Sequence, residues 1–201
     1  MSAEASFQAF GAQRGVPVAI SAPMVRSVPL LADARTDNLG PLVGVTFPGG
    51  FQGTIGQLAY RGYSKEGQGR MFRFTVASTW VMESTPFVPR LFTVRKGRIT
   101  DDYHYGIEAR SDRLWTESTG LNESYEVTTG PYQDANWMRQ LFQPTFVEWL
   151  ARVPPHDFSF ELAYGSLVTS LDRDLVDPAG LDWLCEATGY IAARIRDECL
   201  E

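Results

Sequence analysis

The run NESYEVTTGPYQDANWMRQLFQPTFVEWL, residues 122–150, decides the fold because it passes from a strand pattern to a helix pattern. In ESYEVTT, residues 123–129, Tyr125 and Val127 alternate with polar residues, which predicts a strand. Gly130 and Pro131 then begin a helix, since proline lacks only an N–H that the first helical turn leaves unpaired anyway. A strand followed directly by a helix makes this run an α+β unit.

The predicted helix, residues 131–152, carries apolar residues at helical spacing. Pro144 either ends this helix or begins a second one. The stripe comprises Trp137, Met138, Leu141, Phe142, Phe146, Trp149, Leu150 and Val153. An aromatic stripe at this spacing is far more often core than a ligand site, so we predict that the rings from Tyr125 to Trp149 face inward.

Strand patterns dominate the first half of the chain. Residues 42–47, 53–64 and 70–81 are predicted strands, and the first two are joined by a Pro-Gly-Gly turn. A shorter strand is predicted over 91–94, and residues 97–120 show no clear pattern. In the third strand Phe72, Phe74 and Val76 fall on one face, with Arg73 and Thr75 on the other. That alternation is typical of an antiparallel sheet with one packed face and one wet face.

The remaining elements complete an α+β chain. Residues 158–171 form a predicted hairpin that turns at Tyr164-Gly165. Asp177 caps a predicted helix over 178–199 that begins with Pro178. Its stripe is Leu181, Leu184, Cys185, Thr188, Ala192, Ile195 and Cys199. We therefore predict a single α+β domain, mainly an antiparallel sheet with helices packed on one face.

Residues 1–41 are predicted to be a lead-in to the domain at 42–201. A short amphipathic helix over 4–14 carries Phe7 and Phe10 one turn apart, and Gly15 ends it. The rest of the lead-in is rich in proline and irregular.

Composition excludes several classes of protein. The net charge of −6 disfavours non-specific binding to nucleic acid or anionic lipid. The chain shows neither a signal-peptide pattern nor eighteen consecutive apolar residues, so we expect a cytoplasmic protein without a membrane span. Cys185 and Cys199 lie about 21 Å apart on one continuous helix, which is too far for a disulfide bond.

Three motifs suggest chemistry, and each has a simpler explanation. Asp172-x-Asp174 after an apolar strand has the form of the haloacid-dehalogenase-like phosphatase signature, but no lysine follows it. A polar turn before a capped helix explains the same residues. The run GRMFRFTV, residues 69–76, weakly resembles an RNA-recognition strand but has Met71 where the motif needs glycine. The glycine-rich run at 47–56 has no phosphate-binding pattern.

No catalytic, cofactor-binding or metal site emerges from the sequence, and we expect no cofactor. Asp101, Asp102 and His104 could supply three metal ligands, but an acidic surface loop is the commoner meaning of such a run. A hydrolase would need His104 or His156 within hydrogen-bond reach of a serine or a carboxylate in a cleft.

Aromatic residues outside the helix stripes are the candidate interface or pocket. Tyrosine and tryptophan of this kind favour interfaces and pockets, although a second core layer or strand-edge cover is the commoner explanation. The candidates are Tyr60, Tyr63, Trp80, Tyr103, Tyr105 and Trp115.

The chain also resembles an uncharacterised actinobacterial family related to the DUF3137 type of domain of unknown function. The resemblance rests on FQAFGAQRG, GTIGQLAYRGYS, RMFRFTV and RLFTVRKG, on the run from Glu117 to Leu150, and on FSFELAYGSLVTSL. The run from Glu117 to Leu150 has the family's extended Asn-x-x-Tyr segment followed by a helix. The resemblance implies no catalytic residue, cofactor or substrate.

Three functions remain open after this reading. The first is a non-enzymatic protein-interaction or accessory module that binds a protein partner or its own copy. The second is a binder of a small hydrophobic ligand in a cavity between sheet and helix, which needs an apolar pocket of at least about 300 Å³. The third is an unrecognised hydrolase.

Overall fold

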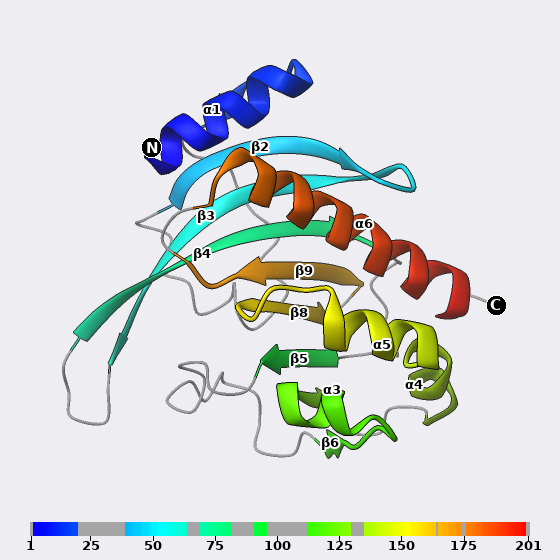
Figure 1. Cartoon of the computed structure of the whole chain (residues 1–201). Helices are drawn as coiled ribbons and strands as arrows, with labels where there is room; N and C mark the ends of the chain where they lie inside the picture. The colour runs from blue at the N-terminus through cyan, green and yellow to red at the C-terminus, as the bar shows by residue number, and fades with distance from the viewer. Residues whose placement is uncertain are drawn as a thin grey trace.

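The computed structural model describes residues 2–19, 39–63, 69–81, 91–95, 112–129, 135–163, 165–173 and 176–199. They form one α+β domain in which helices pack against an antiparallel sheet (Figure 1). The fold class and the single domain predicted from the sequence are therefore confirmed.

The sheet has nine strands in the order β1-β2-β3-β4-β9-β8-β5-β7-β6, and every neighbouring pair is antiparallel. The strands are β1 (Val18–Ala19), β2 (Leu39–Phe47), β3 (Phe51–Tyr63), β4 (Gly69–Trp80), β5 (Leu91–Arg95), β6 (Asp112–Leu114), β7 (Tyr125–Thr129), β8 (Phe158–Ala163) and β9 (Ser166–Leu171). The N-terminal meander therefore joins the rest of the sheet through the pairing of β4 with β9.

The described helices are α1 (Ala3–Arg14), α3 (Thr119–Ser124), α4 (Ala135–Leu141), α5 (Pro144–Arg152) and α6 (Pro178–Cys199). Figure 1 shows α6 lying across β2, β3, β4 and β9, with α4 and α5 further along the same face. Helix α1 packs on β2 and on α6, where Arg14 forms an ion pair with Asp182 at 2.6 Å.

The helix-covered face holds the main core. Thr169 of β9 contacts Thr188 of α6, which identifies the helix-covered side of that strand. Leu167 and Leu171 share that side because side chains alternate along a strand. The large side chains of this core with almost no exposure are Phe7, Phe10, Phe47, Ile55, Leu121, Tyr125, Leu141, Phe146, Phe158 and Phe160. Of the rings predicted to face inward from Tyr125 to Trp149, three are buried, namely Tyr125, Trp137 and Phe146, while Phe142 and Trp149 are only partly buried. Tyr132 lies outside the described residues.

The opposite face corrects the expectation of one packed face and one wet face. The predicted alternation in β4 is present, but Val76 lies on the side away from α6, since its Cα partner is Ser170 and that of Ala77 is Thr169. This opposite face carries apolar Leu58, Val76 and Val168 together with polar Ser78, Ser170 and Glu161, and all six are buried. At the middle of the sheet a polar side chain therefore does not indicate solvent exposure. The prediction of one solvent-exposed face is wrong there.

Turns and helix ends mostly follow their sequence signals. Gly50, in the turn from β2 to β3, and Gly165, before β9, both have positive φ, at 84° and 80°. Gly15 ends α1 with φ 65°, and the Asp177 carboxylate accepts a hydrogen bond from the Gly180 N–H at 2.8 Å at the start of α6. Left-handed backbone favours glycine, and Asp is a preferred N-cap, so these positions could be predicted from the sequence.

Two local predictions needed correction, and one open alternative, the role of Pro144, is decided. Helix α3 was not predicted, and it includes Glu123 and Ser124, which were assigned to a strand. The same helix holds Asn122, so the Asn-x-x-Tyr segment of the family resemblance is not extended here. The predicted 131–152 helix is described as α4 and α5, with Pro144 beginning the second, while residues 131–134 lie outside the described ranges.

The division of the chain at residue 41 stays a prediction. The structure adds that β2 begins at Leu39 and that Phe7 and Phe10 of α1 belong to the same buried cluster as the sheet.

Candidate functional site

The aromatic residues singled out from the sequence do not all lie in the described structure. Trp80 ends β4 and is 49% exposed, and Trp115 follows β6 and is 65% exposed. Four strands separate β4 from β6, which places these two strands roughly 24 Å apart. Tyr60 and Tyr63 lie in β3, although their side chains are not described, and Tyr103 and Tyr105 fall outside the described residues. Trp80 and Trp115 therefore belong to different places on the sheet.

A continuous aromatic cluster instead joins α5, α6 and β8. Its rings, here called the aromatic seam, are Phe142, Phe146, Trp149, Phe158, Phe160, Trp183 and Tyr190. The Trp149 ring lies 4.7 Å from the Tyr190 ring and stacks on the Phe146 ring at 5.9 Å, measured between centroids. The edge of the Trp183 ring meets Phe158 at 5.2 Å. Such contacts are typical of rings that hold a helix to a sheet.

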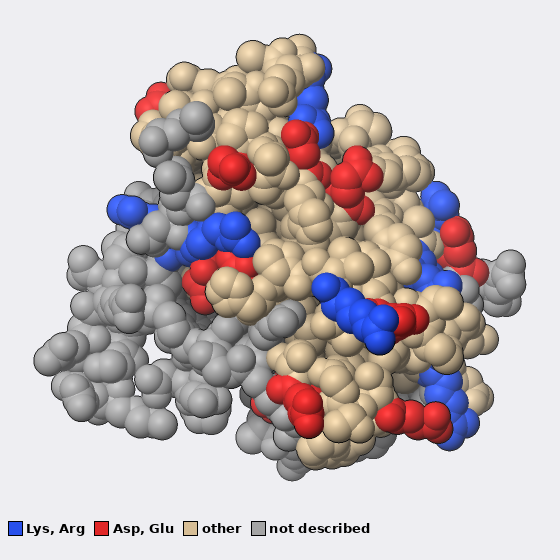
Figure 2. Space-filling view, in the orientation of Figure 1, with Lys and Arg blue, Asp and Glu red and all other residues tan. Residues whose placement is uncertain are grey.

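The seam runs from the core to the surface. Phe146, Phe158 and Phe160 are buried, Trp149 is half-buried, and Tyr190 is 38% exposed. One turn beyond Trp149, Val153 is 52% exposed, so its assignment to the core stripe was wrong. Figure 2 shows a band of uncharged side chains across this helix-covered face, with charged groups on either side. An apolar strip with a charged rim is the usual composition of a protein interface.

Sequence reasoning missed the part of the seam that lies on α6. The stripe of this helix was assigned without Trp183 and Tyr190. Both residues lie on one helix face because they are two turns apart, so a signal existed in their spacing. What the spacing could not give is that α5 lies beside them and completes the aromatic cluster.

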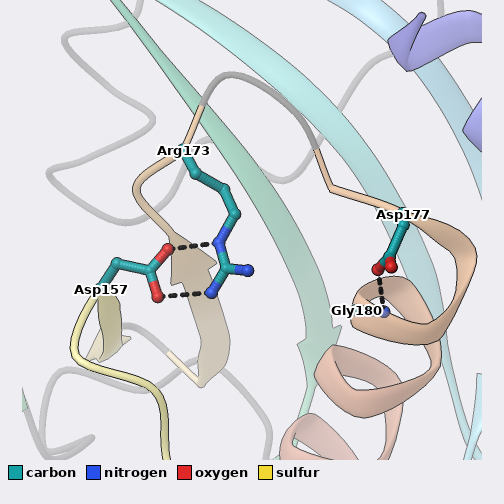
Figure 3. A network of polar contacts seen from close by, with 4 residues as sticks. All are labelled: Asp157, Arg173, Asp177 and Gly180. Atoms are coloured by element: carbon teal, nitrogen blue, oxygen red, sulfur yellow. Dashed lines mark hydrogen bonds and ion pairs between the residues drawn. The ribbon is translucent and has the colours of Figure 1, made fainter. Parts of the chain in front are cut away.

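An ion pair joins Asp157, just before β8, to Arg173, which lies in the acidic run at 172–177 after β9. The Asp157 carboxylate accepts two hydrogen bonds from the Arg173 guanidinium, at 2.5 and 2.6 Å (Figure 3). The hydrogen bond that Arg173 donates to Asp157 raises the pKa of Arg173, whereas burial lowers that pKa by a smaller amount. Asp172 donates its N–H to the Asp157 carbonyl at 3.0 Å, so this loop is held by its own contacts.

These contacts also weigh against phosphatase chemistry. The phosphatase signature sits at the end of a strand of a parallel sheet, whereas β9 is antiparallel to both β4 and β8. Arg173, between the two aspartates of the motif, is bound to Asp157, and Asp174 lies outside the described residues. The structure supports the interpretation as a turn before a capped helix, in which Asp177 is the cap.

The described residues contain no cluster of three or more histidine, cysteine, aspartate or glutamate side chains that could hold a metal ion. His156 is exposed, and no described residue forms a hydrogen bond or ion pair with it. His104, Asp101 and Asp102 lie outside the described ranges. Cys185 is a buried free thiol on the same helix as Cys199, as the helix prediction requires.

Within the described ranges, none of the helices is both long enough and apolar enough to cross a bilayer.

No protein-family model matches the chain, and no curated protein matches it. The chain is similar to a solved structure, the crystal structure of the mycobacterial trehalose monomycolate transport factor A, TtfA, with a TM-score of 0.61 and 10% sequence identity. The match covers 96% of this chain and 92% of that chain. At this identity the likeness shows a shared fold over nearly the whole length and transfers no functional residue.

Proposed function

We propose that this protein is a non-enzymatic accessory module that binds a protein partner through the exposed end of the aromatic seam. The observation that carries the proposal is the continuity of the seam, which runs from buried Phe146 through Trp149 to exposed Tyr190. Exposed Val153 follows one turn after Trp149, at the end of α5. Aromatic anchors that are rigidly supported from below and reach an uncharged surface are the usual centres of binding energy.

The polar groups of the described residues support a non-enzymatic role. Asp157 is bound to Arg173, Asp177 caps α6, and Thr169 and Thr188 bond each other inside the core. Each of these groups has a structural partner, and no described acid or base bonds to exposed His156. Hydrolase chemistry needs such a group held next to a nucleophile.

The fold neighbour suggests a process. That protein is a mycobacterial trehalose monomycolate transport factor. We extend this to a lipid-related accessory role for the present chain, in which the partner is another protein of the transport system. Because unrelated functions share folds, this extension needs its own test.

Affinity purification from the native host tests the proposal. A Val153→Glu/Tyr190→Glu variant places two charges at the exposed end of the seam, one on Tyr190 and one on Val153 beyond it. This variant should lose the partner that the unaltered protein retains. Trp80→Glu and Trp115→Glu, at exposed aromatics elsewhere, serve as matched controls and should retain it. Circular dichroism checks that each variant is folded. Loss of the partner in a control variant, with retention in the seam variant, would move the interface to the aromatics chosen from the sequence.

Self-association is the alternative form of the same proposal. Light scattering of the purified protein after gel filtration decides it: a dimer that the seam variant converts to a monomer makes the second copy the partner. A monomer in both cases leaves a different protein as the partner.

A small hydrophobic ligand is the second candidate, supported by the trehalose monomycolate in the name of the fold neighbour. Native mass spectrometry of protein purified from the host is the test. A bound lipid that survives transfer into the gas phase and is released by unfolding would support it, and a bare polypeptide mass would count against it.

Membership of the actinobacterial family related to DUF3137 is likewise a proposal. A solved structure of any member of that family with the strand order β1-β2-β3-β4-β9-β8-β5-β7-β6 would support it. Another order would refute it.

A further inference from the structure

The hairpin of β3 and β4 extends beyond the rest of the described sheet. The two strands pair continuously to Tyr63↔Gly69, but β2 pairs with β3 only as far as Leu58, and β9 pairs with β4 only from Thr75. Five residue pairs therefore form a ribbon with no described strand on either side, and Figure 1 shows it projecting from the sheet. We call this ribbon, Ala59–Tyr63 with Gly69–Arg73, the arm; five residues make it about 17 Å long.

The arm is basic in an acidic protein. Its two strands contain Arg61, Arg70 and Arg73 and no acidic residue, a net charge of +3. Because the chain carries −6, the remaining residues carry −9. The arm is longer than the Debye length of about 10 Å at 0.1 M salt. The negative charges of the rest of the protein therefore only weakly reduce the positive potential at the far end of the arm. Arg73, at the root of the arm, is exposed, and no described residue forms an ion pair with it.

One edge of β4 in the arm, here called the free edge, presents backbone groups that no described strand meets, and their register is known. Val81, just after β4, donates its N–H to the Gly165 carbonyl on the β9 side. In an antiparallel ladder the groups facing one neighbour recur at every second residue, so the odd-numbered residues of β4 face β9. Beyond the end of β9, the N–H and C=O groups of Met71 and Arg73 therefore point outward, with no described strand to meet them.

We propose that the free edge of β4 in the arm binds an extended acidic segment of a partner protein as an added strand. A two-stranded ribbon is only marginally stable alone, and a third strand supplies the missing backbone bonds. The positive charge of the arm favours an acidic strand over a neutral or basic one. Charged residues on edge strands are also a common means of preventing non-specific strand pairing. A second copy joined arm to arm is disfavoured, since it would bring two charges of +3 together.

This proposal rests on the proposed protein-binding role and adds to it the chemistry of the partner. It is tested on purified components and at a different surface. Failure here therefore leaves the seam proposal standing, and failure of the seam leaves the arm to be judged separately.

The test measures fluorescence anisotropy of the full chain with a labelled peptide of about twelve residues that repeats Thr-Val-Glu-Glu, long enough to cover the free edge. The repeat carries acidic groups on both faces of an extended strand. Matched peptides replace Glu by Gln or by Lys. We expect the acidic peptide to bind at least about tenfold more tightly than either, with affinity falling as salt is raised.

Two variants separate charge from strand addition. Arg70→Glu/Arg73→Glu should abolish binding of the acidic peptide, while Arg139→Glu/Arg152→Glu, the same charge change on α4 and α5, should leave it within about twofold. Met71→Pro removes one outward N–H without removing a bond to β3, and it should weaken binding at least about tenfold. Circular dichroism and thermal unfolding confirm that each variant folds.

Every other outcome overturns the proposal. Absence of binding to the acidic peptide removes it. Binding that survives Met71→Pro but not charge reversal shows a charged surface rather than a strand site. Binding to phosphatidylglycerol vesicles with no binding to the acidic peptide assigns the arm to an anionic membrane surface instead.

Discussion

The hydroxyl oxygens of Thr169 and Thr188 lie 2.6 Å apart in the interior, where neither residue is exposed to solvent. Thr188 also donates to the Leu184 carbonyl at 2.6 Å. A hydroxyl has one proton, so Thr169 must be the donor to Thr188. The order of donation is therefore Thr169 to Thr188 to Leu184, and it ties β9 to α6.

This order predicts an asymmetry between two similar substitutions. Thr188→Val leaves the Thr169 hydroxyl buried without an acceptor and should cost about 1–3 kcal/mol of unfolding free energy. Thr169→Val leaves Thr188 bonded to Leu184 and should cost less. Urea denaturation of both single variants and the double variant is the measurement. Equal costs for the two single variants would contradict the assigned order.

A second prediction concerns glycine in helices. Gly189 of α6 lies against Pro48, and an added Cβ would come within 2.5 Å of the Pro48 Cδ atom. Gly189→Ala should therefore destabilise the fold, although alanine normally stabilises a helix by about 1 kcal/mol over glycine. Gly120→Ala in α3 is the control, since nothing lies within 4 Å of its added Cβ. Thermal unfolding should give shifts of opposite sign for the two variants.

A third prediction compares two ion pairs. Asp157 is buried and holds Arg173 with two hydrogen bonds, so Asp157→Asn should cost about 1–3 kcal/mol of unfolding free energy, reduced because Arg173 is partly exposed and can rehydrate. Glu148 and Arg152 form a pair at 2.8 Å that is mostly exposed. Glu148→Gln should cost at most about 0.5 kcal/mol. Chemical denaturation of the two variants at one pH decides whether burial makes the difference.

A fourth prediction follows from burial of Cys185, which raises the pKa of its thiol to about 12. At pH 8 the thiol stays protonated and enclosed, so iodoacetamide should leave it unmodified until the protein is unfolded in urea. Peptide mass spectrometry distinguishes it from Cys199. Rapid labelling of Cys185 in the native protein would show that α6 opens locally.

The same pKa sets the direction of a pH effect. The folded thiol has a higher pKa than the unfolded thiol, so its contribution to stability is complete below about pH 8.5 and is lost as pH rises toward 12. The fall in unfolding free energy between neutral and alkaline pH should be smaller in Cys185→Ala than in the unaltered protein.

Elements with strong local signals could be predicted from the sequence. Helix α6 has an N-cap, a first-turn proline and a long apolar stripe, and the β8–β9 hairpin has two alternating runs around a glycine. Helix α3 has none of these, because its six residues carry one buried side chain, Leu121. Polar contacts hold it instead: the Asn122 side chain bonds both the N–H and the C=O of Thr116.

Long-range arrangement could not be predicted in the same way. Nothing near Thr75–Trp80 in the sequence indicates that this strand pairs with Ser166–Leu171. The aromatic seam depends on a similar encounter, because Trp149 and Tyr190 come from separate helices. The sequence correctly assigned most of these rings to the interior, but which ones reach the surface depends on where α5 and α6 meet.

The pairing of β4 with β9 has a consequence for biosynthesis. During translation the meander of β1 to β4 leaves the ribosome well before Ser166–Leu171, so the edge of β4 that pairs with β9 has no partner strand until the chain is nearly complete. Pairing of strands that are distant in sequence is slow, and exposed nascent strands are prone to aggregate. Yield in a heterologous host should therefore respond more to chaperone supply and slower synthesis than to any change on the finished surface.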